Sequence, residues 1–256
     1  MVRQSESSLP GGDEGGPSAS SDSYEVVAPE YYQPEWHPTC ADFRDASSAL
    51  IRRVLFPRLS GGTFCEVGCG DSLLCDLLLS GNLQPEPGRI DLVDSSPGML
   101  SYSVNKWAHL SVGLWVADAR RLPFAHGSIN VLISSLGDPY NDRGFWMEVA
   151  RVLAHDGMAI FTTPSYEWAN EYRSADDEFC AVFKLMSGSL ARLASIILPP
   201  DDQVGLIESC EGTKLVVEEK YDFLLGELVE PRKGSKVMAE RGPTSSVVTC
   251  YVVRRS

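Results

Sequence analysis

The 256-residue sequence has no apolar run long enough for a membrane-spanning helix and no apolar core of signal-peptide length near its start. Basic residues are also scarce, because 22 Lys and Arg stand against 35 Asp and Glu, for a formal net charge of −13. Nucleic acids and anionic membranes are bound largely through Lys and Arg. We therefore expect no nucleic-acid partner and no membrane insertion, while the oligomeric state stays open.

The seven cysteines are odd in number and are not spaced like a disulfide framework. The spacing Cys65-x3-Cys69 followed by Cys75 differs from the Cys-x3-Cys-x2-Cys ligand set of radical iron–sulfur enzymes, since position 72 is Ser. We therefore predict no metal site and interpret these residues as reduced thiols of a cytoplasmic protein.

Residues 1–28 are rich in Ser, Gly, Pro and acidic residues and lack apolar periodicity. Such a segment buries too little apolar surface to offset chain entropy, so we expect a disordered leader. The remaining residues, 29–256, are enough for one α/β domain. Its first part, 29–58, has the apolar spacing of a helix, which we expect to cover the site.

Residues 64–72 read FCEVGCGDS and predict a buried strand that ends in a glycine turn and enters a helix at 73–79. Gly68 and Gly70 permit positive φ and a close approach of the backbone to a ligand. A second strand, 90–94, follows at the spacing of a strand–helix–strand unit. It ends in a carboxylate placed to accept hydrogen bonds from two ribose hydroxyls.

The next segments alternate between strand and helix, which indicates a parallel sheet. The expected elements are helix 97–109, strand 113–117, strand 130–135, helix 142–154 and strand 158–163. After Pro164 the pattern changes to a β-hairpin over 179–198. A short helix ending at Cys210 and the last strands, 213–224 and 245–254, follow. We predict an α/β, Rossmann-like, doubly wound, mostly parallel seven-stranded sheet with an antiparallel last strand and a hairpin insertion, 165–198, after the fifth strand.

The run Glu66-Val-Gly68-Cys-Gly70-Asp-Ser72 resembles the first motif of class I S-adenosylmethionine-dependent methyltransferases, with Ser72 where a third glycine is usual. The similarity covers about residues 60–165 and is greatest to the branch of the quinone-biosynthesis methyltransferases. It implies S-adenosylmethionine as the cofactor, with Glu66, Gly68 and Gly70 shaping the methionine pocket. Asp94 would hold the ribose, and Asp118 would face the adenine amino group. Four more residues are expected at the cofactor, namely Arg44, Ser95, Ala119 and Ser134.

Two of these interpretations have alternatives. A dinucleotide-binding domain could also use the glycine turn, but Asp71 lies inside the turn and its charge would repel a diphosphate. S-adenosylmethionine has no phosphate and carries two positive groups, so the charge favours the methyl donor. Arg44 could pair with the methionine carboxylate, or it could be a surface residue of the covering helix.

Residues 134–141, SSLGDPYN, follow the predicted fourth strand and partly resemble the Asp-Pro-Pro-Tyr motif of amino-methyltransferases. Asp138 and Tyr140 are therefore our candidates for acceptor contacts, although the same residues are typical of an ordinary turn. His37 is a further candidate base. The insertion at 165–198 is either a lid over the acceptor or an accessory hairpin.

These observations predict a cytoplasmic S-adenosylmethionine-dependent methyltransferase that transfers a methyl group to an O or N atom of a small-molecule acceptor. Two alternatives stay open. The acceptor could be a peptide or protein side chain, or the domain could bind the cofactor without turnover as a regulatory subunit.

Overall fold

The computed structural model describes residues 3–4, 23–56, 61–80, 88–173, 179–209, 214–238 and 242–256. Within them, eight strands form one sheet in the order β1-β4-β3-β2-β5-β6-β10-β9. These strands are β1 (Arg3–Gln4), β2 (Thr63–Val67), β3 (Arg89–Asp94), β4 (Val112–Val116), β5 (Ile129–Ser134), β6 (Leu153–Pro164), β9 (Leu215–Leu224) and β10 (Ser246–Arg255).

The strand directions agree with the predicted fold class. β2 pairs in parallel with β3 and with β5, β3 pairs in parallel with β4, and β5 with β6. β10 lies between β6 and β9 and is antiparallel to both. The predicted seven-stranded, mostly parallel sheet with an antiparallel last strand is therefore confirmed. β1 is an additional strand, parallel to β4 at the edge of the sheet.

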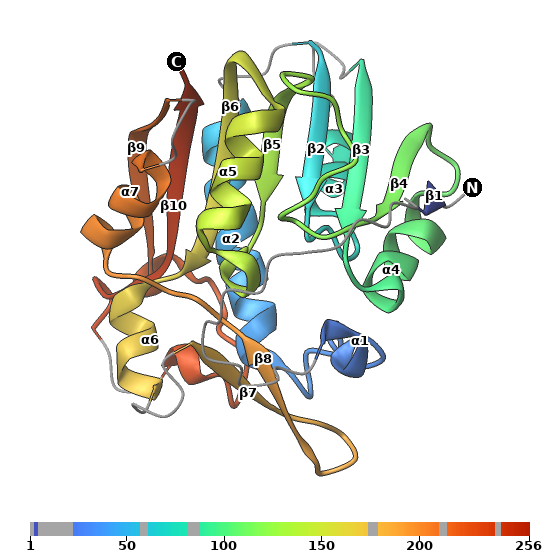
Figure 1. The fold of residues 1–256 in the computed structure, drawn as a ribbon. Coiled ribbons are helices and arrows are strands. Elements are labelled where there is room, and N and C mark those ends of the chain that lie inside the picture. Colours follow the sequence, from blue (N-terminus) through green and yellow to red (C-terminus); the bar gives the residue numbers. More distant parts are fainter. Residues whose placement is uncertain are drawn as a thin grey trace, which may run out of the picture.

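Helices cover both faces of the sheet. They are α1 (Tyr24–Val27), α2 (Pro38–Leu55), α3 (Leu73–Ser80), α4 (Pro97–Trp107), α5 (Arg143–Val152), α6 (Tyr166–Tyr172) and α7 (Pro200–Glu208). In Figure 1, α5 and α7 lie in front of the sheet, and α2 and α3 lie behind it. No helix of the described ranges combines the length and apolarity needed to cross a membrane.

Alternation along the strands creates a core on each face, because successive strand side chains point to opposite sides. Phe64 of β2 and Val252 of β10 pack in one cluster with Leu50 of α2. The adjacent Cys65 belongs instead to the cluster that contains Phe145 of α5. The sheet is thus buried on both faces, as a doubly wound fold requires.

Local capping sets the starts of two helices near the site. The Ser96 hydroxyl accepts a hydrogen bond from the Met99 backbone N–H at 3.0 Å, immediately before α4. The Asp142 carboxylate accepts one from the Phe145 N–H, also at 3.0 Å, before α5. Both caps satisfy backbone donors that the first helical turn leaves without partners.

The parallel strands β2, β3, β4 and β5 all end at the same edge of the sheet. The predicted hairpin is present as β7 (Cys180–Lys184) and β8 (Leu190–Ala194), which pair antiparallel. It lies with α1 beyond this edge of the sheet (Figure 1). The helix α6, which precedes the hairpin, was not part of the prediction.

Some residues of the expected leader, 1–28, belong to the folded domain. Residues 24–27 are helical, and Val27 and Ala28 are 0% and 3% exposed. They are buried because they pack with Ala191 and Leu193 of the hairpin, a contact between distant parts of the chain. Most of the expected leader lies outside the described residues.

Other element ends differ by a few residues. α5 ends at Val152 and β6 begins at Leu153, where we expected the helix to continue to 154. The predicted helix end at Cys210 and strand start at Thr213 lie outside the described residues.

A buried polar network joins α5, α7 and the end of the hairpin. Trp146, which is 0% exposed, donates its indole N–H to the Asn141 side-chain oxygen at 2.9 Å. The Asn141 amide N–H₂ donates to Gln203 at 2.6 Å and to the Ile196 carbonyl at 3.0 Å. Each of these polar groups would lose its partner if Asn141 were truncated.

We predict that Asn141→Ala lowers the free energy of unfolding by at least about 2 kcal/mol, because several buried groups then lack partners at roughly 1–3 kcal/mol each. Denaturant unfolding followed by circular dichroism measures the change. Asn105→Ala, at an exposed position of α4, is the matched control and should leave stability unchanged or slightly higher. Equal stability of the two variants would contradict the role of the network.

Candidate functional site

The glycine turn after β2 brings the backbone against two tyrosine hydroxyls. Gly68 has φ +68° and Gly70 has φ +47°, both in the left-handed region that favours glycine. A Cβ at Gly68 would collide with the Tyr140 hydroxyl, and one at Gly70 would collide with the Tyr32 hydroxyl. Glycine is therefore required here for close approach as well as for conformation.

Glu66 fixes the turn by capping α3. Its carboxylate, 1% exposed, accepts hydrogen bonds from the Ser72 hydroxyl at 2.7 Å and from the Leu74 N–H at 3.0 Å. The Leu73 N–H donates to its other oxygen at 3.2 Å. Burial raises the pKa of Glu66 to about 8, although these hydrogen bonds oppose the rise.

Ser72 adopts φ +63° where the related motif has its third glycine. Its hydroxyl both donates to Glu66 and accepts from the Cys75 N–H at 3.1 Å. These two bonds offset the conformational cost of a positive φ at a residue with a Cβ.

Asp94 ends β3 beside the turn. One carboxylate oxygen accepts from the Gly70 N–H at 3.0 Å, and the other accepts from the Ser96 N–H at 2.9 Å. Burial raises the pKa of Asp94 to about 6, while these backbone donors act in the opposite direction. Each oxygen keeps a further lone pair, so the carboxylate can still accept from a ligand.

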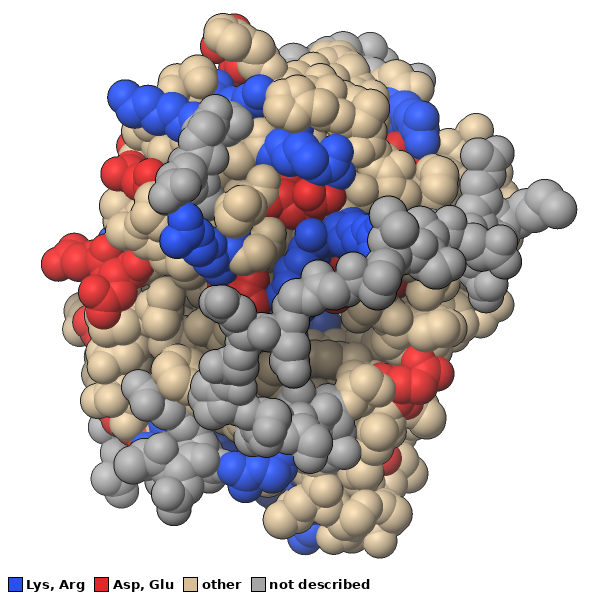
Figure 2. Space-filling view, in the orientation of Figure 1, with Lys and Arg blue, Asp and Glu red and all other residues tan. Residues whose placement is uncertain are grey.

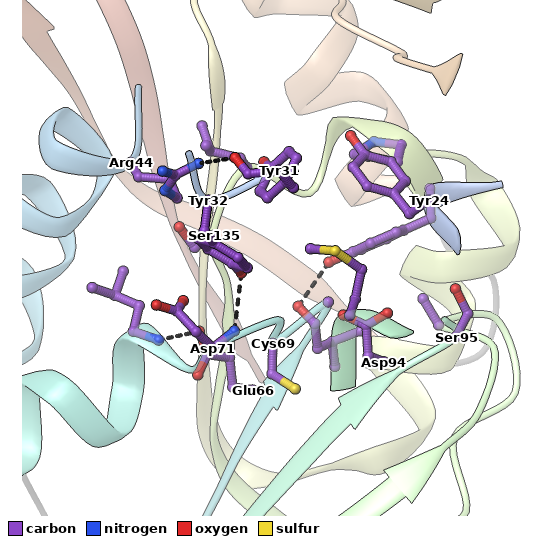
Figure 3. Close-up of a pocket in the computed structure, with 18 of the residues that line it drawn as sticks. Tyr24, Tyr31, Tyr32, Arg44, Glu66, Cys69, Asp71, Asp94, Ser95 and Ser135 are labelled. Carbon is purple, nitrogen blue, oxygen red and sulfur yellow. Dashed lines mark hydrogen bonds between the residues drawn. The ribbon is translucent and has the colours of Figure 1, made fainter. Parts of the chain in front are cut away.

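A cavity of about 520 Å³ lies at this turn. Seven of the residues predicted at the cofactor line it, namely Arg44, Glu66, Gly68, Asp94, Ser95, Asp118 and Ala119. Figure 3 shows Arg44 with Tyr31 and Tyr32 on one side of the cavity, and Asp94 with Ser95 on the other. Gly70 and Ser134 are not among the lining residues.

Arg44 of α2 is held against aromatic rings. Its guanidinium lies 5.1 Å from the centre of the Tyr31 ring and 4.8 Å from that of Tyr32, and it donates to the Tyr31 carbonyl at 3.4 Å. No carboxylate of the described residues forms an ion pair with it. A cation with unused donors therefore faces the cavity, where it can bind an anionic group.

Asp118 is positioned differently from Asp94. Its side chain is 57% exposed, and one oxygen accepts from the Arg120 N–H at 2.8 Å. The Arg120 guanidinium also lies 3.4 Å from this oxygen. Asp118 is thus a solvated residue at the cavity's edge.

Ser134 and Tyr140 form hydrogen bonds at the end of β2, next to the glycine turn. The Tyr140 hydroxyl donates to the Val67 carbonyl at 2.7 Å, so the Ser134 hydroxyl, 2.9 Å away, donates to Tyr140. Burial raises the pKa of Tyr140 well above its usual value. The hydroxyls of both residues are occupied within the protein, and Ser135, next to Ser134, lines the cavity instead.

A second cavity, of about 530 Å³, adjoins the first. Tyr24, Tyr31 and Leu136 line both. Among the predicted acceptor residues, His37 and Asp138 line the second cavity, whereas Tyr140 lines the first. The three predicted residues are therefore divided between the two cavities.

Asp138 is 7% exposed and accepts a hydrogen bond from the Ser195 hydroxyl at 2.5 Å. Arg173 donates to the same Ser195 hydroxyl oxygen at 2.7 Å. Burial raises the pKa of Asp138 to about 6, and the bond from Ser195 and the charge of Arg173 oppose the rise.

His37 forms a buried pair with Glu30. Its Nε2 lies 3.0 Å from a Glu30 carboxylate oxygen, and both side chains are at most 10% exposed. The two Glu30 oxygens also accept from the Met186 N–H in the hairpin turn, at 3.1 and 3.0 Å. Because a carboxylate accepts, Nε2 of His37 is the donor in this pair.

Sequence reasoning missed several residues of the site. Tyr24 falls within the expected leader, and Glu30 and Ser195 occur in no recognisable motif. Ser195 reaches Asp138 only because the hairpin folds back over residues 138–140. The only sequence signal was the run of aromatic residues around Tyr31.

The described cysteines are all free thiols, and burial raises the pKa of Cys65 and Cys69 well above the usual value. Among the described ranges, no group of three or more His, Cys, Asp or Glu side chains has an arrangement that could hold a metal ion.

Comparisons with known proteins agree with this geometry. Residues 64–157 match a family described as methyltransferase domain. The chain is 33% identical over 100 residues to the malonyl-[acyl-carrier protein] O-methyltransferase of Hahella chejuensis (strain KCTC 2396). That match covers 38% of this chain and 35% of the relative, so the chain spans about a third of the relative's length.

Solved structures share the fold at low identity. Geranyl diphosphate C-methyltransferase from Streptomyces coelicolor A3(2), in complex with Mg²⁺, geranyl diphosphate and S-adenosyl-L-homocysteine, has a TM-score of 0.58 at 13% identity, covering 81% of this chain and 78% of that one. An S-adenosylmethionine dependent methyltransferase from Mesorhizobium loti has a TM-score of 0.57 at 14% identity, covering 83% and 100%. Residues 64–157 are therefore a methyltransferase domain, in agreement with the predicted similarity to class I S-adenosylmethionine-dependent methyltransferases, and the fold around them is shared with solved methyltransferases.

Proposed function

We propose that this protein transfers the methyl group of S-adenosylmethionine to an O or N atom of a small-molecule acceptor held in the second cavity. The observation that carries the proposal is the pair of adjoining cavities, which share Tyr24, Tyr31 and Leu136. The glycine turn lies at the first cavity. Two residues that could act as a general base, His37 and Asp138, line the second cavity.

The first cavity fits the cofactor. Gly68 lines it, and Asp94 offers a buried carboxylate that can accept from hydroxyl donors. Arg44 has donors for the methionine carboxylate at the opposite side of the cavity (Figure 3). The turn also contains Asp71, which lies 3.5 Å from Lys106 and disfavours a diphosphate in the same place.

When bound, the cofactor supplies an activated methyl group on a sulfonium. The protein's residues then have to hold the acceptor close to the methyl and exclude water. Tyr24 and Tyr31, which line both cavities, are placed to shape the passage between them. In this proposal the hairpin is the lid over the acceptor. The Met186 N–H in the hairpin turn donates to the Glu30 carboxylate, and this contact joins the lid to the segment before α2.

A base is needed when the acceptor atom is a hydroxyl oxygen, and the second cavity contains two groups of suitable type. Asp138 is oriented by Ser195, and His37 is oriented by Glu30. A neutral amine would not require either. Residues of α2, α6 and the hairpin line this cavity.

We predict that Asp94→Ala weakens binding of S-adenosylhomocysteine by about 10- to 100-fold, because the hydrogen bonds that the ligand hydroxyls donate to this buried carboxylate are lost. Isothermal titration calorimetry measures the affinity. Asp118→Ala is the matched control and should change it by less than about fivefold, since water replaces an exposed carboxylate. Similar effects of the two variants, with both folded by circular dichroism, would refute the assignment of Asp94.

The role of Arg44 can be separated from general effects on the cavity. We predict that Arg44→Gln weakens S-adenosylhomocysteine about tenfold but leaves 5′-methylthioadenosine, which lacks the carboxylate, unchanged. Calorimetric titration of both ligands provides the comparison. Equal losses for both ligands would mean that Arg44 supports the aromatic residues and does not bind the carboxylate.

Asp138 should make stability depend on pH. Its pKa is raised to about 6 by burial, so the folded state binds this proton more tightly than the unfolded state. The wild type should therefore lose stability relative to Asp138→Asn as the pH rises from about 4 to about 7, by on the order of 2 kcal/mol.

Denaturant unfolding of both proteins at several pH values measures this difference. Asp202→Asn, at an exposed position in the first turn of α7, is the control and should show no comparable trend. A constant difference between the wild type and Asp138→Asn across this range would contradict the burial of an ionisable group.

A further inference from the structure

The chain has only six lysines, and three of them line the second cavity. These are Lys184, Lys233 and Lys236. Elsewhere Lys106 pairs with Asp76 at 2.5 Å, and Lys220 pairs with Asp222 at 3.0 Å. Concentration of half the lysines at one cavity is notable in a protein with a net charge of −13.

None of the three cavity lysines forms an ion pair with a described carboxylate, although acidic residues are abundant. The neighbouring Arg232 shows the contrast, because it pairs with Asp42 at 2.7 Å and Asp45 at 2.6 Å. These two ion pairs join the segment of residues 232–236 to α2, and they do not involve Lys233 or Lys236.

Contacts around Lys236 hold this segment in place. Its backbone N–H donates to the Thr39 hydroxyl at 2.9 Å, and the Tyr172 hydroxyl donates to its carbonyl at 2.7 Å. The ammonium lies 5.8 Å from the centre of the Tyr172 ring. The lysines at the rim therefore come from two separate segments, since Lys184 ends β7.

The lining of the second cavity has more basic than acidic side chains. Glu35 and Asp138 are the described carboxylates that line it, and Asp138 is bonded to Ser195. Arg173 and three lysines line it on the basic side. Figure 2 also shows basic side chains at the lower end of the molecule, where the hairpin lies in Figure 1.

Most of the remaining lining is aromatic or apolar, and part of it is exposed. Trp36 and Val182 are 51% and 41% exposed. Phe43 and Trp168 form an edge-to-face pair with ring centres 4.6 Å apart. Such a lining buries the apolar body of a ligand, while a few polar groups set its orientation.

We propose that the second cavity selects an acceptor with an aromatic or apolar body and an anionic group, which Lys184, Lys233 and Lys236 bind at the rim. This inference rests on the proposed methyl transfer, because it assigns the acceptor class of that reaction. The body lies among the aromatic side chains, and the charge stays at the solvent side near the lysines.

Two fluorescent probes that differ only in charge test this inference. 8-Anilinonaphthalene-1-sulfonate carries an aromatic body and a sulfonate, and N-phenyl-1-naphthylamine is the same body without the charge. Titration of each probe uses the wild type, the triple variant Lys184→Gln/Lys233→Gln/Lys236→Gln and the control Lys214→Gln, which is exposed and lines neither cavity.

The triple variant should bind the sulfonate about tenfold more weakly and the neutral probe with unchanged affinity. Lys214→Gln should bind both probes as the wild type does. Affinity of the wild type for the sulfonate should fall as NaCl rises from about 50 to about 500 mM. Melting curves of all variants check that they are folded.

Three outcomes would overturn the inference: equal sulfonate affinity in the wild type and triple variant, equal loss of both probes, or displacement of the sulfonate by S-adenosylhomocysteine. The last would place the probe in the cofactor cavity. Calorimetric titration of the wild type with S-adenosylhomocysteine separates the two proposals. Absence of that binding defeats the proposed methyl transfer, whereas the probe comparison reports on the lysines alone.

Discussion

The hydrogen bonds between Glu66 and the first turn of α3 are the interaction on which the site depends. They fix the path of the chain from β2 into α3, and with it the positions of Gly68 and Gly70. Gly70 in turn donates to Asp94, so the carboxylate at the end of β3 is oriented by the same turn. Loss of this cap would disturb both the base of the cofactor cavity and the residue proposed to hold the ribose.

The two cavities draw on different parts of the chain. The family match at 64–157 contains much of the first cavity but only Leu136 and Asp138 of the second. Most of the second cavity comes from α2, α6, the hairpin and the segment before β10. The proposed cofactor site therefore lies largely within the family match, whereas the proposed acceptor site is built mostly from residues outside it.

Local patterns in the sequence were enough to predict the sheet and the glycine turn, because strands buried on both faces are marked by short apolar runs. The burial of Val27 could not be predicted, since it depends on Leu193, 166 positions away in the chain. For the same reason Ser134 was expected at the cofactor, whereas its hydroxyl is bonded to Tyr140. Side-chain partners set by tertiary contacts leave no periodic signal.

Calorimetric titration of the wild-type protein with S-adenosylhomocysteine, and separately with NAD⁺, tests the central claim most directly. The account predicts micromolar binding of S-adenosylhomocysteine and no binding of NAD⁺, because Asp71 lies in the glycine turn where a diphosphate would have to sit. Binding of NAD⁺ alone, or of neither ligand by folded protein, would contradict it.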